Sequence, residues 1–533
     1  MNLKWKRLAA LLAVMTLVAA ACGRDDSSSS SDDSGSSDTS DSGGDEASGA
    51  FIDPSIDCAD YEGTAGIDGD TIKIGTIRPA DGPYAIYDQV TTGLDAWVTS
   101  VNSEGGIKAG DGNTYKVELI KENDSYDPGK TPALAQKLVE QDGVFAIVGT
   151  IGTENNLAIR DYLNDACVPN IALATGSTNW GDADQYPWYI SGLPSYALEA
   201  NYWADYIADT KPEAKIALLY QDDDFGTAYQ KALTKAVERS NNDNGTTLEI
   251  VGEQGYNPLS GTTTEAAVTS LSQTGADVFI VGIGGTPCPQ TLTFIPESWA
   301  PETYISVTCA GNTAMSLAGG KDVGVIQAQA TLDPADPADA DQEAVKEFKT
   351  KGAAAGLDEG QLDGGITSVG WGFGSFFGML VENTDKVERA DIMNTAFSLD
   401  QPAFGLVRPD IEIKTDGAAD PWAIEGFRIA QRNADGGWDE LAPVKNRNGE
   451  SNELALRVMP QTMRIASACF GRERLPQAAH AALAGCFISA GQNCVAAERL
   501  LVLVAALNTH DRLTVRMSTG PAFVLGCRWQ RRL

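Results

Sequence analysis

Four loops rich in hydroxyl and aromatic side chains could bind a small solute. They are RPADGPYAIY (78–87), TIGTENN (150–156), TGSTNW (175–180) and QDDDFGTAY (221–229). Each loop follows a short apolar run and leads into a helical pattern. Hydroxyls and free backbone N–H groups at the start of a helix suit a carboxylate, and aromatic rings suit an apolar or cationic group beside it. The loops therefore indicate a binding site for a small organic ion.

The chain offers little for acid–base or metal catalysis. Both histidines, His480 and His510, lie in the segment 451–533. The rest of the chain thus has no ordinary proton shuttle at neutral pH and no histidine to bind a metal. The net charge of −34 leaves no basic face for nucleic acid. We expect no enzyme, no cofactor, no metal and no nucleic-acid partner.

Strands and helices alternate along most of the chain. Several β-rich runs are almost continuously apolar, which is typical of parallel strands buried on both faces. The expected strands are 71–77, 115–120, 144–149, 170–174, 215–220, 248–253, 277–283, 303–308 and 323–330. The expected helices are 88–103, 128–140, 153–165, 195–209, 226–239, 263–273 and 340–353. This alternation predicts an α/β fold with helices on both faces of parallel sheets.

Nine strands before residue 340 are more than one such sheet usually holds, so two α/β lobes are expected. Proteins of this class bind ligands at the carboxyl ends of their strands. The four loops lie at those ends. A long apolar pattern over 366–381 is expected to be core, and 411–417, 427–433 and 436–444 are expected to be closing strands of the second lobe.

Nine cysteines are present, and an exported chain can form disulfides. We expect Cys288 to pair with Cys309, because each closely follows a strand pattern and the two strands should be neighbours. Cys58 with Cys167 then follows by elimination. Four unpaired buried thiols are the alternative.

The N-terminus carries an export signal. Residues 1–21 have a positive start followed by a 14-residue apolar stretch, which is too short to span a membrane but typical of a signal peptide. The three alanines before Cys22 resemble the lipobox of bacterial lipoproteins. That resemblance implies cleavage before Cys22 and its acylation, which would hold the protein on a membrane. An ordinary cleaved signal with an incidental cysteine is the alternative.

The segment after Cys22, up to residue 54, is dominated by Ser, Asp and Gly. Over 23–50 it has no apolar side chain larger than alanine, so it cannot bury enough apolar surface to offset its ordering entropy. We expect a disordered linker that carries the lipidated cysteine.

From about 72 to 443, the chain resembles the type I periplasmic binding proteins, specifically the branched-chain amino-acid-binding lipoproteins of ABC importers. The phrases IKIGTIRPADGP, LDAWVTSVNSEGGI, ENDSYDPGKTPALAQKLVEQDGVFAIVG and VPNIALATGSTN carry the resemblance, in order and spacing. It implies two Rossmann-like lobes joined by a three-segment hinge. The implied lobes are 55–195 with 333–410 and 196–332 with 411–445.

The resemblance also implies a ligand site. In that family a hydroxyl after the VG strand holds the carboxylate of the ligand, and Thr153 corresponds to it. Small and hydroxyl residues after the next strand assist, and aromatic rings from both lobes flank the ligand. Thr286 stands where the family has a further aromatic residue. The implied ligand-binding residues are Tyr87, Thr153, Gly176, Ser177, Thr178, Phe225 and Thr286.

One family feature is missing. Members that bind α-amino acids use a glutamate of the second lobe to pair the ammonium group, and Ala310 stands near that position. A desolvated ammonium needs a partner. Either an acid of another loop replaces the glutamate, or the ligand is not a standard amino acid. The candidate acids are Glu154, Asp222, Asp223 and Asp224.

The C-terminal segment 446–533 differs from the rest of the chain. From residue 451 it has ten arginines against four acidic residues. Residues 481–502 resemble the nucleophile segment of aldehyde dehydrogenases, with Cys494 at the catalytic position. No nicotinamide domain or glutamate base precedes them. We expect an inactive or disordered appended segment, and aldehyde dehydrogenase activity is a remote alternative.

Taken together, these patterns predict a monomeric solute-binding lipoprotein on the extracytoplasmic face of the cell membrane. It would bind a small amino acid or a related carboxylate or amide between two closing lobes and deliver it to ABC permease subunits. A ligand-sensing lipoprotein with no transporter is the alternative.

Overall fold

The computed structural model describes residues 51–54, 58, 61–309, 311–452 and 454, with the backbone alone at 312 and 313. It also describes the backbone of two short strands, β17 (Leu513–Arg516) and β18 (Gly526–Trp529), which pair with each other. The predicted signal peptide, Cys22, most of the linker, Ala310 and the Cys494 segment lie outside the described residues. None of the helices in the described part is long and apolar enough to cross a membrane.

The first sheet has the order β3-β4-β2-β5-β6-β7, and β1 pairs with the first two residues of β2. The pairs from β4 through β2, β5 and β6 to β7 are all parallel. Strands β5 and β6 are buried along their whole length, as their continuous apolar sequences predict. The strands are β1 (Ile67–Asp68), β2 (Thr71–Arg78), β3 (Ile107–Lys108), β4 (Thr114–Asn123), β5 (Ala146–Val148), β6 (Asn170–Leu173) and β7 (Tyr189–Ser191).

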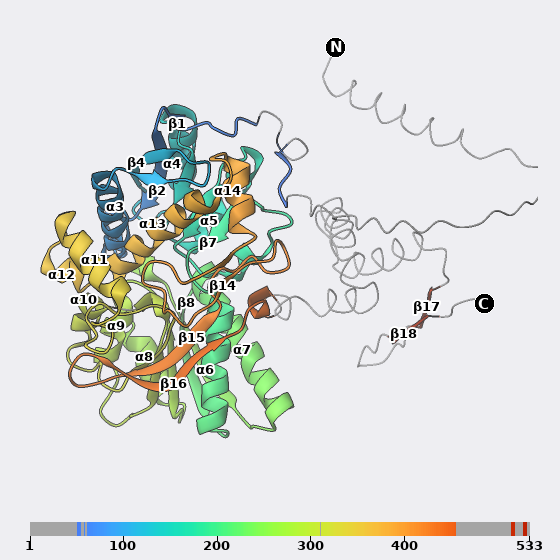
Figure 1. Ribbon diagram of the computed structural model, residues 1–533. Helices are drawn as coiled ribbons and strands as arrows, with labels where there is room; N and C mark the ends of the chain where they lie inside the picture. The colour runs from blue at the N-terminus through green and yellow to red at the C-terminus, as the bar shows by residue number, and fades with distance from the viewer. Residues whose placement is uncertain are drawn as a thin grey trace, which may run out of the picture. The chain divides into compact units, whose positions relative to one another are not determined.

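The second sheet has the order β16-β15-β12-β11-β10-β8-β9. Five strands are parallel, and β15 and β16 add an antiparallel hairpin beside β12. The strands are β8 (Lys215–Gln221), β9 (Glu249–Tyr256), β10 (Val278–Gly282), β11 (Glu302–Ile305), β12 (Ile326–Gln329), β15 (Gly426–Arg432) and β16 (Trp438–Asn446). We call the first sheet with its helices lobe 1 and the second sheet with its helices lobe 2 (Figure 1).

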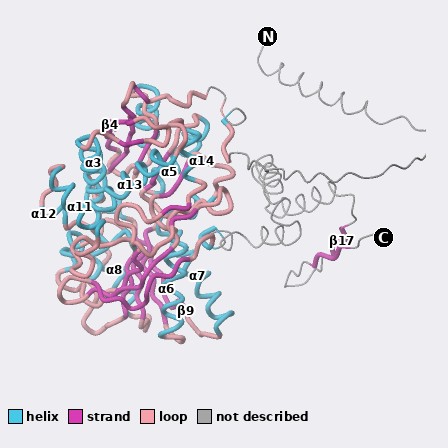
Figure 2. The backbone as a smooth tube through the Cα atoms, in the orientation of Figure 1, coloured by secondary structure: helices cyan, strands magenta, loops and turns pink. Residues whose placement is uncertain are grey.

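Helices cover both faces of each sheet (Figure 2). In lobe 1, α3 and α13 lie side by side, as do α4 and α5, and in lobe 2, α6 packs against α7 while α8 contacts β8 and β9. The helices of lobe 1 are α3 (Asp88–Ser103), α4 (Thr131–Gln136), α5 (Thr153–Asp165), α11 (Glu343–Ala354), α12 (Glu359–Leu362), α13 (Gly365–Asn383) and α14 (Arg389–Ala396). The helices of lobe 2 are α6 (Tyr196–Thr210), α7 (Asp224–Asn244), α8 (Glu265–Ser272), α9 (Pro287–Thr293) and α10 (Asn312–Met315). The predicted α/β fold with two Rossmann-like lobes is confirmed.

Two predicted elements differ in the structure. The helix expected from Pro128 begins at Thr131, because Asp127 forms a turn just before it. The Asp127 side chain accepts a hydrogen bond from Gly129 N at 2.9 Å, and its carbonyl accepts one from Lys130 N at 2.9 Å. The strand expected over 411–417 does not join the second sheet. Its strand β14 (Ile413–Lys414) pairs with β13 (Asp400–Gln401).

Helices α3 and α13 approach each other closely through glycines. A Cβ atom at Gly93 would lie 1.9 Å from the carbonyl oxygen of Thr367, and one at Gly370 would lie 1.8 Å from that of Val90. Real Cβ atoms do not come so near, so only glycine allows this separation. The contact fixes α13 beside the first sheet.

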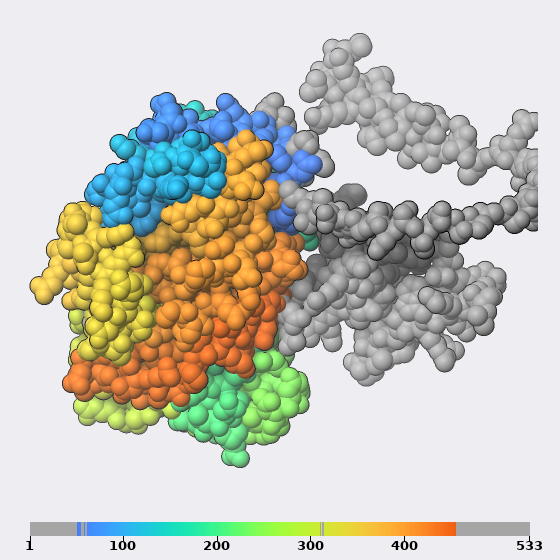
Figure 3. Space-filling view, in the orientation of Figure 1, coloured from blue at the N-terminus to red at the C-terminus, as the bar shows by residue number. Residues whose placement is uncertain are grey.

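The backbone passes between the two sheets three times: from β7 to α6, from β12 to α11, and from β14 to β15. The crossing from β12 to α11 is joined to the loop between β13 and β14. Thr331 pairs with Val407 in an antiparallel bridge, and the Leu332 N–H donates to the Leu406 carbonyl at 2.8 Å. In the space-filling view, the orange surface of the chain's later part lies against the blue surface of lobe 1 and the green surface of lobe 2 (Figure 3).

A buried ion pair links the same two segments of the chain. The guanidinium of Arg408 donates to both carboxylate oxygens of Asp339, at 3.1 and 3.2 Å. Both side chains are buried, and Asp339 also accepts from the Asp333 N–H at 2.9 Å. Arg428 lies farther from the carboxylate, at 4.0 Å.

The disulfides are those expected from the sequence. Cys58 is bonded to Cys167 within lobe 1, and Cys288 is bonded to Cys309 within lobe 2. The Cα atoms of the pairs lie 6.1 and 5.9 Å apart, inside the range that a disulfide spans.

The C-terminal segment was expected to start at residue 446, which is too early. The Glu425 carboxylate accepts from the N–H groups of Gly449 and Ser451, the latter at 2.8 Å. Asn452 accepts from the indole N–H of Trp422 at 3.1 Å, and Leu454 is buried. The folded body therefore extends at least to residue 454.

Candidate functional site

A cavity of about 130 Å³ lies between the two lobes. Its wall comes largely from segments that directly follow the parallel strands, including 151–153 after β5, 174–175 after β6, 192–194 after β7 and 307–308 after β11. The carboxyl ends of the parallel strands in both sheets therefore face one space, as expected for ligand binding in this type of fold.

Two threonine hydroxyls form the polar side of the cavity on lobe 1. Thr153 and Thr175 are buried, and their Oγ1 atoms lie 2.6 Å apart in a hydrogen bond. Thr153 is the first residue of α5, whose first-turn N–H groups have no partners within the helix. Gly152 precedes it with a φ of 103°, and a Cβ there would lie 2.4 Å from Asn155 Oδ1. This glycine lets the backbone turn into the helix and leaves the two hydroxyls on the cavity wall.

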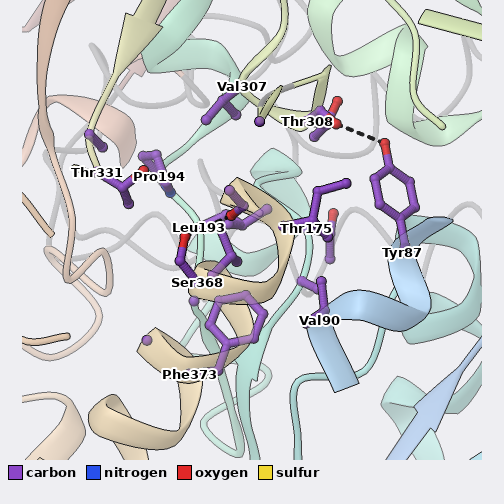
Figure 4. A pocket seen from close by; sticks show the side chains of 18 of the residues that line it. Tyr87, Val90, Thr175, Leu193, Pro194, Val307, Thr308, Thr331, Ser368 and Phe373 are labelled. Carbon is purple, nitrogen blue, oxygen red and sulfur yellow. Dashed lines mark hydrogen bonds between the residues drawn. The ribbon is translucent and has the colours of Figure 1, made fainter. Parts of the chain in front are cut away.

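Tyr87 connects the lobes across the cavity. Its hydroxyl donates to the Thr308 carbonyl at 2.9 Å, as Figure 4 shows, and accepts from the Gly285 N–H at 2.6 Å. Burial raises the pKa of Tyr87 to about 12, so the hydroxyl stays protonated at neutral pH and keeps donating. Tyr84 makes a second contact between the lobes by donating to Gln221 Oε1 at 2.6 Å. The structure is therefore a closed arrangement of the two lobes.

Aromatic rings of lobe 2 form another wall. Phe225, near the start of α7, packs edge-on against Tyr196 with ring centroids 5.2 Å apart. Tyr196 in turn stacks on Tyr229 at 4.7 Å. Edge-on and offset-stacked pairs are favourable arrangements, so each ring stabilises the position of the next.

The remaining lining is mostly apolar. Figure 4 shows Val90, Leu193, Pro194 and Phe373 around the cavity, with Ser368 on α13 near them. The sequence had placed α13 in the core, and most of it is buried there. Its first turns nevertheless line the cavity, through Gly365, Ile366, Ser368, Val369, Gly372 and Phe373.

Three of the seven residues expected at the site line this cavity: Tyr87, Thr153 and Phe225. The other four, Gly176, Ser177, Thr178 and Thr286, are not part of its described lining. The Gly176 carbonyl accepts from the Tyr196 N–H at 2.8 Å, and the chain then turns into a short 3₁₀ helix, Thr178–Gly181. Thr175, just before that turn, provides the hydroxyl instead.

Thr286 precedes Pro287 at the start of α9, away from the cavity lining, and its carbonyl accepts from the Gln290 N–H at 3.4 Å.

The lining residues that the sequence analysis did not single out include Thr175, Tyr196 and Ser368. Thr175 follows the expected strand 170–174, so the same strand-end argument could have found it. Tyr196 follows β7, which the sequence analysis did not predict. Ser368 lies within an apolar helical pattern that gives no such signal.

The four acids proposed as partners for an ammonium group do not line the cavity: Glu154, Asp222, Asp223 and Asp224. Asp223 is held elsewhere, because its Oδ1 accepts from the Gly226 N–H at 3.0 Å and caps α7, and its Oδ2 accepts from the Gln221 amide. Burial, followed by the nearby Asp223 and Asp224 charges, raises the pKa of Glu154.

The sequence profile of the family described as periplasmic binding protein matches residues 71–436, which is more than half of the chain. The chain belongs to the periplasmic binding protein family. The match begins at the first residue of β2 and ends beyond β15, so it includes strands of both sheets.

Curated members of the family are distant relatives. An amino acid binding protein of Pseudomonas aeruginosa is 25% identical over 221 residues, which cover 40% of this chain and 53% of that protein. The chain spans about half the length of the curated relatives it matches.

Solved structures of binding proteins share the fold over almost their whole length. A branched-chain amino acid ABC transporter protein from Thermus thermophilus, solved with bound valine, has a TM-score of 0.62 at 15% identity, covering 73% of this chain and 98% of that one. A solute-binding protein from R. palustris, in complex with 4-hydroxybenzoate, has a TM-score of 0.58 at 18% identity, covering 71% and 98%.

A buried carboxyl group lies behind the aromatic wall of this binding protein. Glu199 on α6 accepts from the Tyr229 hydroxyl at 2.6 Å and from the Val307 N–H at 2.7 Å. The side chain is fully buried, and burial raises its pKa from 4.5 to about 8. Glu199 is therefore protonated over much of the neutral range.

Replacing Glu199 by Gln should change how stability depends on pH. The folded protein holds the Glu199 proton up to about pH 8, whereas the unfolded chain loses it near pH 4.5. The stability from this group is thus fully present below pH 4.5 and is lost as pH rises through 8. Glu199→Gln has no proton to lose. The measurement is the free energy of unfolding in urea at several pH values, for the variant and the wild type. We expect the difference, variant minus wild type, to be a few kcal/mol larger at pH 9 than at pH 4.5.

The comparison isolates one group, because Glu425, whose pKa burial also raises to about 8, is present in both proteins. If the free energy of unfolding depended on pH in the same way for both proteins, Glu199 would not titrate as described.

Proposed function

We propose that this chain is an extracytoplasmic solute-binding lipoprotein of an ABC importer, which binds a small amino acid or a related carboxylate or amide between its lobes. The observation that carries the proposal is a hydrogen-bonded pair of threonines in the lining of a cavity between two lobes, Thr153 at the N-terminus of α5 and Thr175 after β6. Hydroxyls and N–H groups at a helix start are suited to a carboxylate. The names of the relatives, which include binding proteins for Leu, Ile and Val, agree with it.

The mechanism follows from the contacts between the lobes. Tyr87 reaches Gly285 and Thr308 only when the lobes are together. A solute that touches Thr153 of lobe 1 and Phe225 of lobe 2 at once binds the closed state better than the open one, and so it shifts the equilibrium toward closure. The permease subunits would receive the solute from this closed state.

The membrane attachment is part of the proposal and rests on the sequence. The apolar stretch that ends in three alanines before Cys22, and the polar linker after it, favour a lipid anchor on the extracytoplasmic face. The anchor would keep the binding protein near the permease.

The test is solute binding by a hydroxyl-free variant. A panel of amino acids, amides and small carboxylates is screened by thermal shift on the full chain, and the affinity of each binder is then measured by calorimetry. Thr153→Val with Thr175→Val should weaken binding at least tenfold, because hydrogen bonds to a charged group contribute about 1.5–3 kcal/mol each.

The chain offers a matched control. Thr264 and Thr291 form another buried pair of threonine hydroxyls, 2.8 Å apart, outside the described cavity lining. Thr264→Val with Thr291→Val should keep wild-type affinity. Equal losses of affinity in both double variants would assign the effect to general destabilisation. The proposed function would be contradicted if none of the solutes in the panel bound to the protein.

A further inference from the structure

We infer that the solute held in this cavity carries no ammonium group: it is an amine-free carboxylate, or its amide, with a compact apolar body. This inference rests on the proposed function and narrows its solute class. It follows from the charged groups around the cavity, from the atoms they already contact, and from the size of the apolar part.

One acid is present in the described cavity lining, Asp333, and each of its oxygens already has a donor. Its Oδ1 accepts from the Ala335 N–H at 3.0 Å, and its Oδ2 accepts from the indole N–H of Trp438 at 3.0 Å. Both bonds hold the carboxylate against its own loop and β16. These two bonds and the nearby Arg432 charge already stabilise the Asp333 carboxylate, so it gains less from an added ammonium group.

Other acids near the cavity are also occupied. Asp223 caps α7, and Glu199 lies behind Tyr229 with donors on both oxygens. Glu199 and Asp223 are both outside the described lining. Apart from Asp333, an ammonium group desolvated here would find neutral acceptors only, and a buried charge without a full counter-ion is unfavourable.

The cavity does contain groups that can bind a carboxylate. The described lining has no lysine or arginine, so an anion would be held by the Thr153 and Thr175 hydroxyls and the N–H groups at the start of α5. Helix N-termini bind anions without a cationic side chain. The same hydroxyls can hydrogen-bond a neutral amide.

The apolar part of the cavity limits the size of the solute. Its wall includes Val90, Leu193, Phe373 and Phe404. The volume of about 130 Å³ is close to that of an apolar cavity of about 150 Å³ that holds a benzene molecule. A single aromatic ring or a short branched chain therefore fits as the body of the solute.

The test compares solutes that differ only in the amine. Calorimetry on the full chain measures leucine against 4-methylpentanoate, and phenylalanine against 3-phenylpropanoate. We expect the amine-free member of at least one pair to bind at least tenfold more tightly than its amino acid. Every binder in the wider panel of amino acids, amides and carboxylates should also lack an amine.

The outcomes separate the two proposals. An amino acid that binds as tightly as its amine-free partner, or more tightly, would overturn this inference and leave the proposed function in place. A panel in which no solute binds would overturn both.

Discussion

Replacing Arg408 by Met is expected to lower the free energy of unfolding by about 3 kcal/mol. Methionine replaces the apolar stem of the arginine but leaves the buried Asp339 carboxylate without its bidentate partner. Breaking a buried ion pair by removing one partner costs about 3–5 kcal/mol. We expect the lower end of this range, because Arg428 still lies 4.0 Å from Asp339.

Urea unfolding of the purified variant measures this change. The control is Lys351→Met, which removes a half-exposed cation that contacts Glu104 at 3.0 Å and Glu347 at 2.9 Å. Such surface pairs contribute about 0–1 kcal/mol. Adding Asp339→Asn to the Arg408 variant should restore part of the loss, since no charge is then left unpaired. Equal effects of the Arg408 and Lys351 variants would refute the prediction.

The second large effect is expected from Gly370→Ala on α13. The added methyl group would lie 1.8 Å from the carbonyl oxygen of Val90, which belongs to the backbone of α3 and cannot rotate away. The two helices must separate, and they are also in contact at Gly93. We expect a loss of about 3 kcal/mol, near the upper end of the usual range for overpacked cores.

Gly372 provides the control on the same helix. A Cβ there meets no heavy atom within 4 Å, so Gly372→Ala should stabilise the helix by about 0.5–1 kcal/mol. Thermal unfolding of both variants gives the comparison. If the two alanine variants shifted the melting temperature in the same direction, the close approach of α3 and α13 would not control stability.

The sheets were predictable because several of their strands are continuous apolar runs in the sequence. All nine strands expected before residue 340 are present, and runs such as VFIVG in β10 are buried at every residue. Runs of that kind remain informative whatever surrounds them, because a strand covered on both faces needs apolar residues at every position. The short strand β7 was missed, since three residues carry too little pattern.

Features that depend on one side chain were less predictable. Asp127 has the right type and position for a helix cap, but its carboxylate bonds to Gly129 N and makes a turn. The segment at Ile413 has a strand-like sequence, yet the neighbouring Thr415 hydroxyl donates to the Ala396 carbonyl and ties it to the end of α14. Local sequence cannot distinguish these competing partners.

The site was predictable at the level of loops and not of single residues. Thr153 begins a helix directly after a strand, so its position depended only on that helix start. In the next loop, several hydroxyl residues stand close together, and which one meets the cavity depends on where the backbone turns. A Cβ at Gly176 would lie 2.1 Å from the Pro194 carbonyl, so the turn is set by a segment of chain that the local sequence does not reveal.

Each disulfide joins two residues of the same lobe, Cys58 with Cys167 and Cys288 with Cys309. Neither of them restrains the three backbone crossings. In the proposed mechanism the chain bends at these crossings, and only non-covalent contacts such as the bridge between Thr331 and Val407 oppose that bending. Disulfide formation in an exported protein would therefore stiffen each lobe without limiting how far the two lobes separate.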